Sequence, residues 1–370
     1  MPQNYQLLNP NTDVTTTKTL LHEAIPITGS IVSGTYGTFP NGGNIKNYTH
    51  GMFQSVYDYP YLSSSANHIF DLTMGYDESS DLSQSAPTTA GMQSKKINIY
   101  NQFAQVLLGY TGSSNQVEIF ESDLDYGDND RQMKEAFFVN FSRLLSKDQV
   151  KPGTFSISLG RGAWATPVAV NYSQATLITL TDRSASLTQG TKSTPGGTYG
   201  VLYSGSNADS RCGLVFYEAG IAVLSSSVFM SASATTEDSI PDFSCYPQDA
   251  ASANLIYDTN ASMISQSISG NCDALRHRIY NLSYNNTTEI NSTIYFCRVP
   301  ANSFNYSSNP TYTTNSKINV KNVAEDLPVS YITTVGLYNA QNELLAVAKV
   351  SEPLRKDPTN EITLRVRLDY

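Results

Sequence analysis

The sequence has little charge and no long apolar run. Charged residues make up 15% of the 370 residues, and the 23 Lys and Arg are outnumbered by 32 Asp and Glu. The net charge of −9 disfavours nucleic acid as the main partner, because phosphate binding needs clustered basic side chains. Apolar runs such as 213–217 are far too short to span a bilayer. Residues 1–5 lack the charged and apolar regions of a signal peptide, so we expect synthesis in the cytoplasm.

Cysteine and histidine are also scarce, which limits metal chemistry. The cysteines are Cys212, Cys245, Cys272 and Cys297, and the histidines are His22, His50, His68 and His277. These residues do not form the close pairs that are typical of zinc sites. We expect buried free thiols, with a disulfide as an open alternative. We expect His277 on a polar helix face and His68 as a partly buried side chain with a partner.

The composition instead favours strands, turns and interfaces. The chain has 24 Tyr but a single Trp, and Ser, Thr and Asn are abundant. β-Branched and aromatic side chains suit pleated surfaces, whereas Asn and Ser suit turns. Tyr also supplies contact area and a hydrogen bond together, which is useful at protein interfaces, although a polar extracellular or virion surface has a similar composition.

The last forty residues carry the clearest pattern. Two apolar segments within 330–349 flank a polar turn at 339–342, which predicts a β-hairpin. In the final ten residues apolar and polar side chains alternate, which predicts a half-buried terminal strand tied into a sheet. The apolar members of that alternation are Ile362, Leu364, Val366 and Leu368.

The length exceeds what one hydrophobic core usually supports, so we expect several domains or subdomains. The predicted fold is mainly β with a minor helical part (α+β). Its centre is an antiparallel β-sandwich or barrel-like domain, followed by the C-terminal β-hairpin and final strand. Four segments are expected. They are an extended N-terminal arm (1–65), a helix-containing subdomain (66–153), an antiparallel β domain with long loops (154–325) and the C-terminal hairpin and strand (326–370).

Three segments show helical spacing. The first has an apolar stripe of Ile99, Phe103, Val106, Leu107 and Tyr110 with a stop near Gly109. The second has a stripe of Met133, Phe137, Phe141, Leu144 and Leu145, with N-caps at 128–130 and a stop at 152–153. The third lies within 242–285, with apolar Met263, Ile264, Ile268, Leu275 and Ile279, and Asp273 near its start.

Short apolar segments predict the strands of the β domain. They are 155–159, 176–181, 199–203, 214–217, 221–224 and 292–299. The Ser-, Thr- and Gly-rich stretch 185–198 is expected to be a long exposed loop.

Two acidic clusters are candidate sites. The cluster Asp123–Asp130 resembles a calcium loop, but Lys134 occupies the position of the bidentate Glu, so helix capping is the simpler interpretation. The second cluster, Asp77, Glu78 and Asp81, lies in a Ser-rich turn and is interpreted as solvated surface. A carboxylate pair for glycoside hydrolysis needs only spatial proximity, so it stays open, but its sequence setting gives it no support.

A local basic patch lies near the C-terminus. Its members are Arg355, Lys356, Arg365 and Arg367. The patch suits either an acidic neighbour or the solvent face of an edge strand. From the residues alone we assign no catalytic, cofactor-binding or metal-ligating residue and expect no cofactor.

Several segments resemble virion structural proteins. The hairpin segment 335–349, with Val335-Gly-Leu-Tyr338 before Leu344-Leu-Ala-Val347, resembles a hairpin of tail and baseplate-associated proteins of tailed bacteriophages. Four further segments resemble virion structural proteins of contractile-tailed phages of the cyanophage type. They are 67–75, 215–224, 304–312 and 351–358. The resemblance implies a non-enzymatic structural subunit of the virion tail, baseplate or neck. It also implies other virion structural proteins as partners and a homo-oligomer in a symmetric ring.

Two other functions remain as alternatives. The first is a host receptor-binding or adhesin module of the phage tail, in which Ser-, Thr- and Tyr-rich loops contact host glycans or protein. The second is a tail-associated wall-degrading enzyme that uses carboxylates such as Asp77 and Asp125.

Overall fold

The structure is a computed structural model that describes part of the chain. The residues described are 5–26, 42–84, 90–110, 116–121, 132–160, 177–183, 185, 190–204, 211–229, 263, 266–307, 313–314, 317–318, 325 and 327–370. The fold is mostly antiparallel β-sheet, with 52% strand and 16% helix, and its described strands close no barrel. This confirms the expected mainly β fold with a minor helical part. None of the described helices has the length and apolarity needed to cross a membrane.

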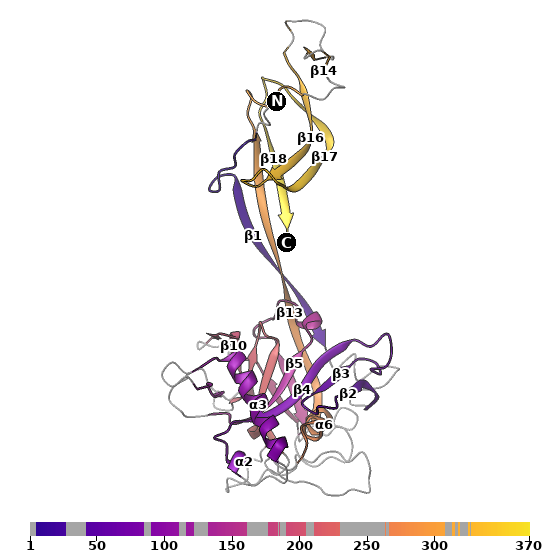
Figure 1. Ribbon diagram of the computed structural model, residues 1–370, viewed down its shortest axis with the longest axis vertical. Coiled ribbons are helices and arrows are strands. Elements are labelled where there is room, and N and C mark those ends of the chain that lie inside the picture. Colours follow the sequence, from indigo (N-terminus) through magenta and orange to yellow (C-terminus); the bar gives the residue numbers. More distant parts are fainter. Residues whose placement is uncertain are drawn as a thin grey trace. The chain divides into compact units, whose positions relative to one another are not determined.

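The chain divides into two compact units. Unit 1 contains residues 1–20 and 289–370, and unit 2 contains residues 21–288. Two strands, β1 (Val14–Pro26) and β13 (Ile279–Val299), contribute residues to both units (Figure 1). The four segments expected from the sequence stay a prediction. Residues 1–65, expected as an extended arm, contribute β1, β2 (Ile45–Asn47) and β3 (Gln54–Tyr57).

Unit 2 is built on one antiparallel sheet. From β13 the strand order continues as β7 (Ser156–Gly160), β8 (Leu177–Thr181), β10 (Gly197–Ser204), β11 (Arg211–Phe216), β12 (Ile221–Ser225), β5 (Glu135–Phe141), β4 (His68–Tyr76), β3 and β2. The short strands β6 (Gln149–Val150) and β9 (Lys192–Thr194) pair with β13 and β10. The strands expected between residues 155 and 224 are therefore confirmed. Part of the expected loop 185–198 instead forms the β9–β10 hairpin.

The second predicted helix is wrong, because its apolar stripe lies on a central strand. Residues 135–141 form β5, which pairs with β12 on one side and β4 on the other. Four consecutive residues, 136–139, are buried, so both faces of the strand are covered. A continuous apolar run is compatible with a strand buried on both faces as well as with the apolar stripe of a helix. The helix α4 (Arg143–Ser146) is a single turn that follows β5.

Two longer helices cover opposite faces of this sheet. The expected first helix is confirmed as α3 (Ala90–Leu107), and the ring of Phe103 stacks on Phe138 of β5 at 4.2 Å. Val106 and Tyr110 are exposed, contrary to the predicted stripe. The third helix is confirmed as α6 (Ile268–Arg278), but Ser267 caps it in place of the predicted Asp273. Ile264 of that predicted segment lies outside the described residues.

The face that each helix covers follows from strand alternation. Thr73 is opposite Phe138 in the β4–β5 register, whereas Leu72 is opposite Gln54 in the β3–β4 register. Gln54 donates a hydrogen bond to Asp273 of α6 at 2.9 Å. Because neighbouring residues of a strand point to opposite faces, α3 and α6 cover different sides of β4.

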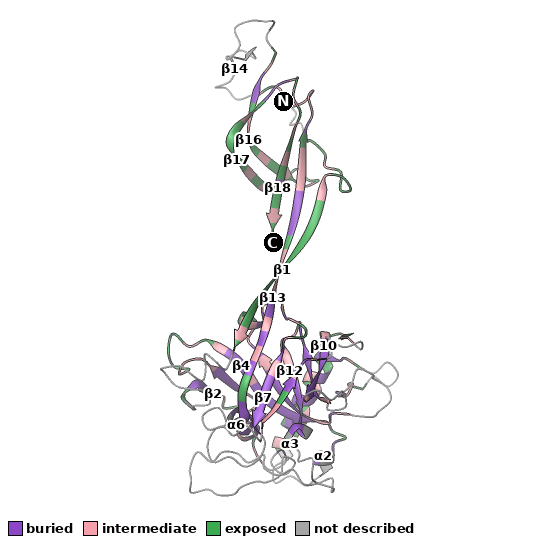
Figure 2. Cartoon of the chain, turned by 180° about the vertical axis from the view of Figure 1, so that it is seen from behind, coloured by how far each residue is buried: buried purple, intermediate pink, exposed green. Residues whose placement is uncertain are grey.

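The helices and strands of unit 2 share one hydrophobic core. The shorter helical elements are η1 (Gly42–Asn44), α2 (Asp81–Gln84) and η4 (Ser226–Phe229). In Figure 2 the buried residues concentrate along strands such as β4, β7 and β12. The fully buried aromatic residues of this core include Phe70, Tyr76, Tyr100, Phe120, Phe137, Phe138, Tyr199, Phe216 and Tyr217.

Unit 1 is built from strands of both chain regions. The terminal strand β18 (Ile362–Asp369) pairs antiparallel with β13 over residues 292–299, and residues 14–20 of β1 lie on the other side of β13. A separate hairpin joins β16 (Ser330–Tyr338) to β17 (Leu344–Lys356), and β14 (Thr313–Thr314) pairs with β15 (Lys317–Ile318). The predicted C-terminal hairpin and alternating terminal strand are confirmed.

Unit 1 buries very little apolar surface. Among its described residues the buried apolar side chains are Ile294, Val299, Val329 and Val366. All residues of the main hydrophobic core belong to unit 2. Most positions of β1, β16 and β17 are exposed or half-buried (Figure 2).

Candidate functional site

The acidic candidates do not form a site among the described residues. The predicted calcium cluster Asp123–Asp130, including Asp125, lies outside them, as does Cys245. Asp77 accepts a hydrogen bond from the amide of Ser79 at 2.8 Å and so closes a surface turn. Glu78 is exposed, and the side chain of Asp81 is outside the description. Where the side chains are described, no group of three or more His, Cys, Asp or Glu is placed to hold a metal ion.

The cysteines within the described ranges form no disulfide with one another. Cys212 and Cys272 are buried, and Cys297 is half-buried. Burial raises the pKa of the Cys272 thiol far above its ordinary value, so this thiol stays protonated.

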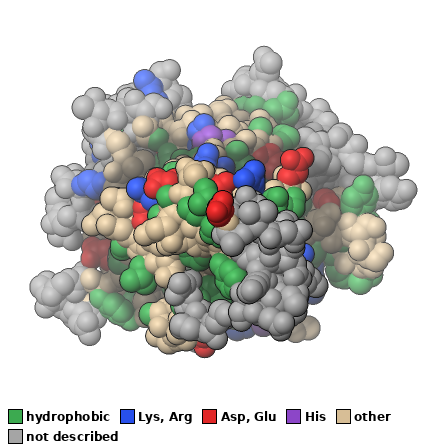
Figure 3. Space-filling model, turned by 90° about the horizontal axis from the view of Figure 1, so that it is seen from above, with side chains coloured by type: hydrophobic (Ala, Val, Ile, Leu, Met, Phe, Trp, Pro, Cys, Tyr) green, Lys and Arg blue, Asp and Glu red, His purple; other side chains and the backbone are tan. Residues whose placement is uncertain are grey.

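The predicted basic patch separates into three different environments. Lys356 is completely buried, whereas Arg365 is exposed at the solvent side of β18. Arg367 forms an ion pair with Asp369 at 2.6 Å and donates to Ser292 at 2.9 Å. Arg355 forms an ion pair with Asp357 at 3.3 Å. Basic and acidic side chains also intermingle on the face shown in Figure 3.

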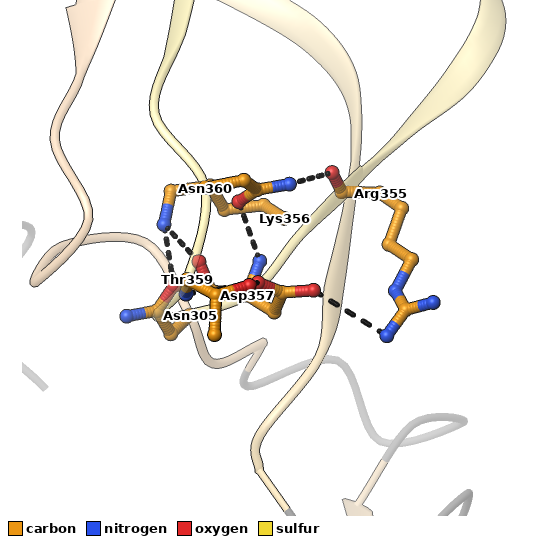
Figure 4. A network of polar contacts seen from close by, with 6 residues as sticks. All are labelled: Asn305, Arg355, Lys356, Asp357, Thr359 and Asn360. Carbon is orange, nitrogen blue, oxygen red and sulfur yellow. Dashed lines mark hydrogen bonds and ion pairs between the residues drawn. The ribbon is translucent and has the colours of Figure 1, made fainter.

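Lys356 is the centre of a polar network in unit 1 (Figure 4). Its ammonium donates to the backbone oxygen of Ala301 at 3.2 Å, to Asn305 Oδ1 at 2.6 Å and to the backbone oxygen of Asp357 at 2.7 Å. These bonds join the end of β17 to the segment that follows β13. The network satisfies a buried charge and leaves its ammonium without access to a ligand, so its role is structural.

The turn after β17 is closed by a second set of bonds. Asn360 accepts from the amide of Asp357 at 2.9 Å and donates to the backbone oxygen of Arg355 at 3.0 Å (Figure 4). Hydrogen bonds from Thr359, with smaller effects of Arg355 and Lys356, hold the pKa of the Asp357 carboxyl below its ordinary value. The aspartate stays ionised beside the lysine at neutral pH.

The β16–β17 hairpin presents an exposed apolar surface. Gly336 is opposite Val347, and a Cβ atom added at Gly336 would lie 2.9 Å from the Tyr338 ring and 3.2 Å from Leu344 Cδ1. Tyr338, Leu344 and Val347 therefore lie on one face, which we call the hairpin face. They are 42%, 51% and 52% exposed. The ring of Tyr5 meets Tyr338 edge-on at 5.0 Å.

A polar row crosses the edge of the sheet in unit 2. The registers align Lys46 of β2 with Ser55 of β3, and Ser55 with Asp71 of β4. Ser55 Oγ donates to Asp71 Oδ1 at 2.5 Å, and His68 Nε2 lies 2.8 Å from the same oxygen. This confirms the expectation of a partly buried His68 with a partner. The row lies on the α3 side of the sheet, and Lys95 of α3 donates to the backbone oxygen of His50 at 3.0 Å.

Aromatic rings adjoin this row. The hydroxyl of Tyr48 lies 3.3 Å from Ser55 Oγ, and its ring stacks on the imidazole of His50 at 5.1 Å and 11°. Phe53 contacts both rings, with centroids 4.7 Å from Tyr48 and 5.0 Å from His50. Lys46 Nζ lies 4.8 Å from the centroid of Tyr48. We call these residues together with Ser55, His68 and Asp71 the β2–β4 cluster.

The β2–β4 cluster is better suited to binding than to hydrolysis. Ser55 donates to the carboxylate and not to the imidazole, so the base that would activate a serine nucleophile is misplaced. Tyr57 packs near His68 at 5.6 Å, and burial, the Tyr48 hydroxyl and the Asp71 charge raise the pKa of Tyr57. Of the sequence candidates the cluster includes His50 and His68, whereas His22 lies on β1, 3.1 Å from Thr287 Oγ1. The His277 side chain is outside the description, so its predicted place stays a prediction.

Sequence reasoning missed Ser55 and Asp71. Only the three-residue spacing of His68 and Asp71 hinted at a pair, and Ser55 comes from another strand. Comparison of the chain with protein-family models, curated proteins and solved structures returned no match.

Proposed function

We propose that this protein is a non-enzymatic structural subunit that assembles with copies of itself and with sister proteins through unit 1. The observation that carries the proposal is the small core of unit 1. The four buried apolar side chains among its described residues stabilise a unit of about a hundred residues poorly, because folding must offset a large conformational entropy. Burial against a partner would supply the missing apolar contact.

The exposed surface of unit 1 has the composition of an interface. Beyond the hairpin face, apolar side chains are exposed on and around its strands, namely Leu7, Leu20, Phe304, Tyr306, Leu327, Tyr331, Leu345 and Tyr370. Aromatic and aliphatic groups without dense charge are typical of the centre of a protein interface. The hairpin is also a two-stranded sheet, and such a sheet is marginally stable by itself.

The finer proposal is a subunit of a phage virion, in the tail, baseplate or neck. It is supported by the resemblance of the segments 67–75, 215–224, 304–312 and 351–358 to virion structural proteins of contractile-tailed phages. The hairpin 335–349 resembles tail and baseplate-associated proteins of tailed phages. Particle proteins of this kind position their neighbours, so the proposal assigns no substrate turnover to the chain.

Self-association of the purified protein tests the assembly. We expect oligomers in sedimentation velocity, and we expect the double variant Leu344→Glu and Val347→Glu to dissociate at least about a hundredfold more readily. Ser351→Glu adds one charge at an exposed position of the same strand and serves as the matched control. A wild-type protein that stays monomeric at about 100 μM would contradict self-assembly through this face.

Fractionation tests the virion assignment separately. A lysate of the cells that produce the chain is separated on a density gradient, and the chain is followed by mass spectrometry. We expect it to sediment with tailed particles. Recovery only from the particle-free fractions would count against the assignment, whatever the oligomeric state.

A further inference from the structure

We propose that the β2–β4 cluster of unit 2 is a binding site for a neutral saccharide. This inference is independent of the assembly proposed for unit 1, because all residues involved belong to unit 2. A sugar ring offers a flat C–H face and a rim of hydroxyl groups. It is bound by an aromatic face beside fixed hydrogen-bonding groups, which is the combination that amphipathic aromatic sites provide.

The cluster provides the aromatic face. The imidazole of His50 is exposed, and it stacks on Tyr48 through one side of its ring. Because the residue is exposed, part of its ring surface can meet a ligand. Phe53 is half-buried and tilted at 42° to His50, so the two rings form a shallow corner.

The cluster also provides free hydrogen-bonding atoms. Asp71 uses Oδ1 for both Ser55 and His68, and in the described part of the chain Asp71 Oδ2 and His68 Nδ1 have no partner. The side chains of Asp71 and His68 are 24% and 33% exposed, so a ligand can reach them. A carboxylate oxygen accepts strongly from a sugar hydroxyl, and an imidazole nitrogen can accept or donate.

The cluster holds charges of both signs, and the Lys95 ammonium also lies beside it, 3.0 Å from the backbone oxygen of His50. The Lys46 ammonium already lies over the Tyr48 ring and repels a second cation from that position. The Asp71 carboxylate repels an anion in the same way. A polyhydroxyl ligand avoids both conflicts and uses donors and acceptors together.

The site is held in shape before any ligand binds. Ser55 is 2% exposed and fixes both the Tyr48 hydroxyl and the Asp71 carboxylate. Ser55 and Asp71 come from the paired strands β3 and β4, whose register sets their spacing. Little ordering remains to be done on binding, which helps a site with few contacts.

The four histidines allow a direct test. In the full-length protein labelled with ¹³C at His Cε1, we titrate methyl glycosides of glucose, galactose, mannose and N-acetylglucosamine. We expect at least one to shift the His50 and His68 resonances with an affinity of about 1 mM, while His22 on β1 stays unchanged. If none of the four shifts His50 or His68, the proposal is overturned.

Variants locate the binding. His50→Ala removes the stacking face and should weaken binding about three- to tenfold, whereas His22→Ala, at another exposed histidine, should leave it unchanged. Asp71→Asn should weaken binding about tenfold or more. Because Asp71 also holds Ser55, its variant is first compared with the wild type by thermal unfolding, and His50→Ala provides the second test.

Glycoside binding that survives both variants would overturn the proposal. Choline is the cationic probe, and shifts with choline in place of the glycosides would also overturn it.

Discussion

Two lysines in the described part of the chain are fully buried, and each donates to backbone oxygens. Lys356 of unit 1 uses Ala301 and Asp357 together with the side chain of Asn305. Lys96 of α3 donates to the backbone oxygens of Met263 and Gln266, the second at 2.8 Å. A buried ammonium persists only with such acceptors, so each lysine links segments that are distant in the sequence.

Lys356→Met is expected to destabilise unit 1 by about 2–4 kcal/mol, because it leaves one buried and two part-buried acceptors without their donor. Hydrogen exchange of the β16–β17 amides, followed by mass spectrometry, measures the loss as faster exchange. Lys349→Met changes an exposed lysine of the same strand and should stay within about 0.5 kcal/mol of the wild type. Equal exchange in the two variants would contradict the role assigned to Lys356.

Lys96 predicts a pH dependence of unit 2. Burial lowers the pKa of Lys96 from its ordinary 10.5 to about 8. Between these values the unfolded chain keeps a proton that the folded protein has lost, so the free energy of unfolding rises with pH. From about pH 7.5 to about pH 9.5 the gain is about 2 kcal/mol relative to Lys96→Met, which lacks the titrating group. Urea unfolding of both proteins at both pH values measures this gain in the free energy of unfolding. Equal changes in the wild type and in Lys96→Met would contradict the titration of Lys96.

At the residue scale, the sequence predicted the burial of single side chains better than it predicted their hydrogen-bond partners. The partner of His68, Asp71, lies three residues further along the same strand, whereas Ser55 reaches Asp71 only through the β3–β4 register. Register depends on tertiary structure, so it could not be read from separate segments.

At the scale of elements, the contact between α3 and β4 depends on a glycine. A Cβ atom at Gly75 would lie 2.5 Å from the backbone oxygen of Lys96 and 2.8 Å from the amide nitrogen of Tyr100. The helix backbone therefore lies directly on the strand, and neither partner can yield through a side-chain rotation. This close approach sets the position of α3 over the sheet.

Gly75→Ala is expected to destabilise unit 2 by about 3 kcal/mol or more, because the helix has to move away from β4. Gly91→Ala, within α3 itself, meets open space and should stabilise the helix by about 0.5–1 kcal/mol. Thermal unfolding of the two variants gives the comparison. A neutral Gly75→Ala would show that α3 shifts freely.

The elements also show where sequence patterns were ambiguous. The alternation in 362–369 has one interpretation, and β18 confirms it. The stripe of Met133, Phe137 and Phe141 fits a helix, but the intervening Phe138 and Val139 are equally buried. Only the neighbouring strands β4 and β12 decide the outcome, because they cover the backbone edges of β5.

At the scale of the whole chain, the two units have unequal stability. Unit 2 contains the complete aromatic core, whereas unit 1 has few buried apolar side chains and depends on strand pairing and the Lys356 network. We therefore expect two separate steps of thermal unfolding, with unit 1 unfolding first.

Truncation after Asn360 tests this difference, because it removes β18 and the buried Val366 from unit 1. Calorimetry should show the lower transition lost or lowered by about 10 °C or more, while the upper transition moves by less than about 2 °C. Thr363→Ala, an exposed change on β18, is the control for the full-length chain. A single transition that moves as a whole would contradict the independence of the units.

The division of unit 1 between residues 1–20 and 289–370 has a consequence for biosynthesis. A ribosome that adds about 5–20 residues per second needs roughly 15 s to a minute to make the intervening residues 21–288. During that time the early segment of β1 waits without the partners that complete its sheet. We therefore expect unit 2 to form first on the ribosome and unit 1 to form late, through the pairing of segments that are distant in the sequence.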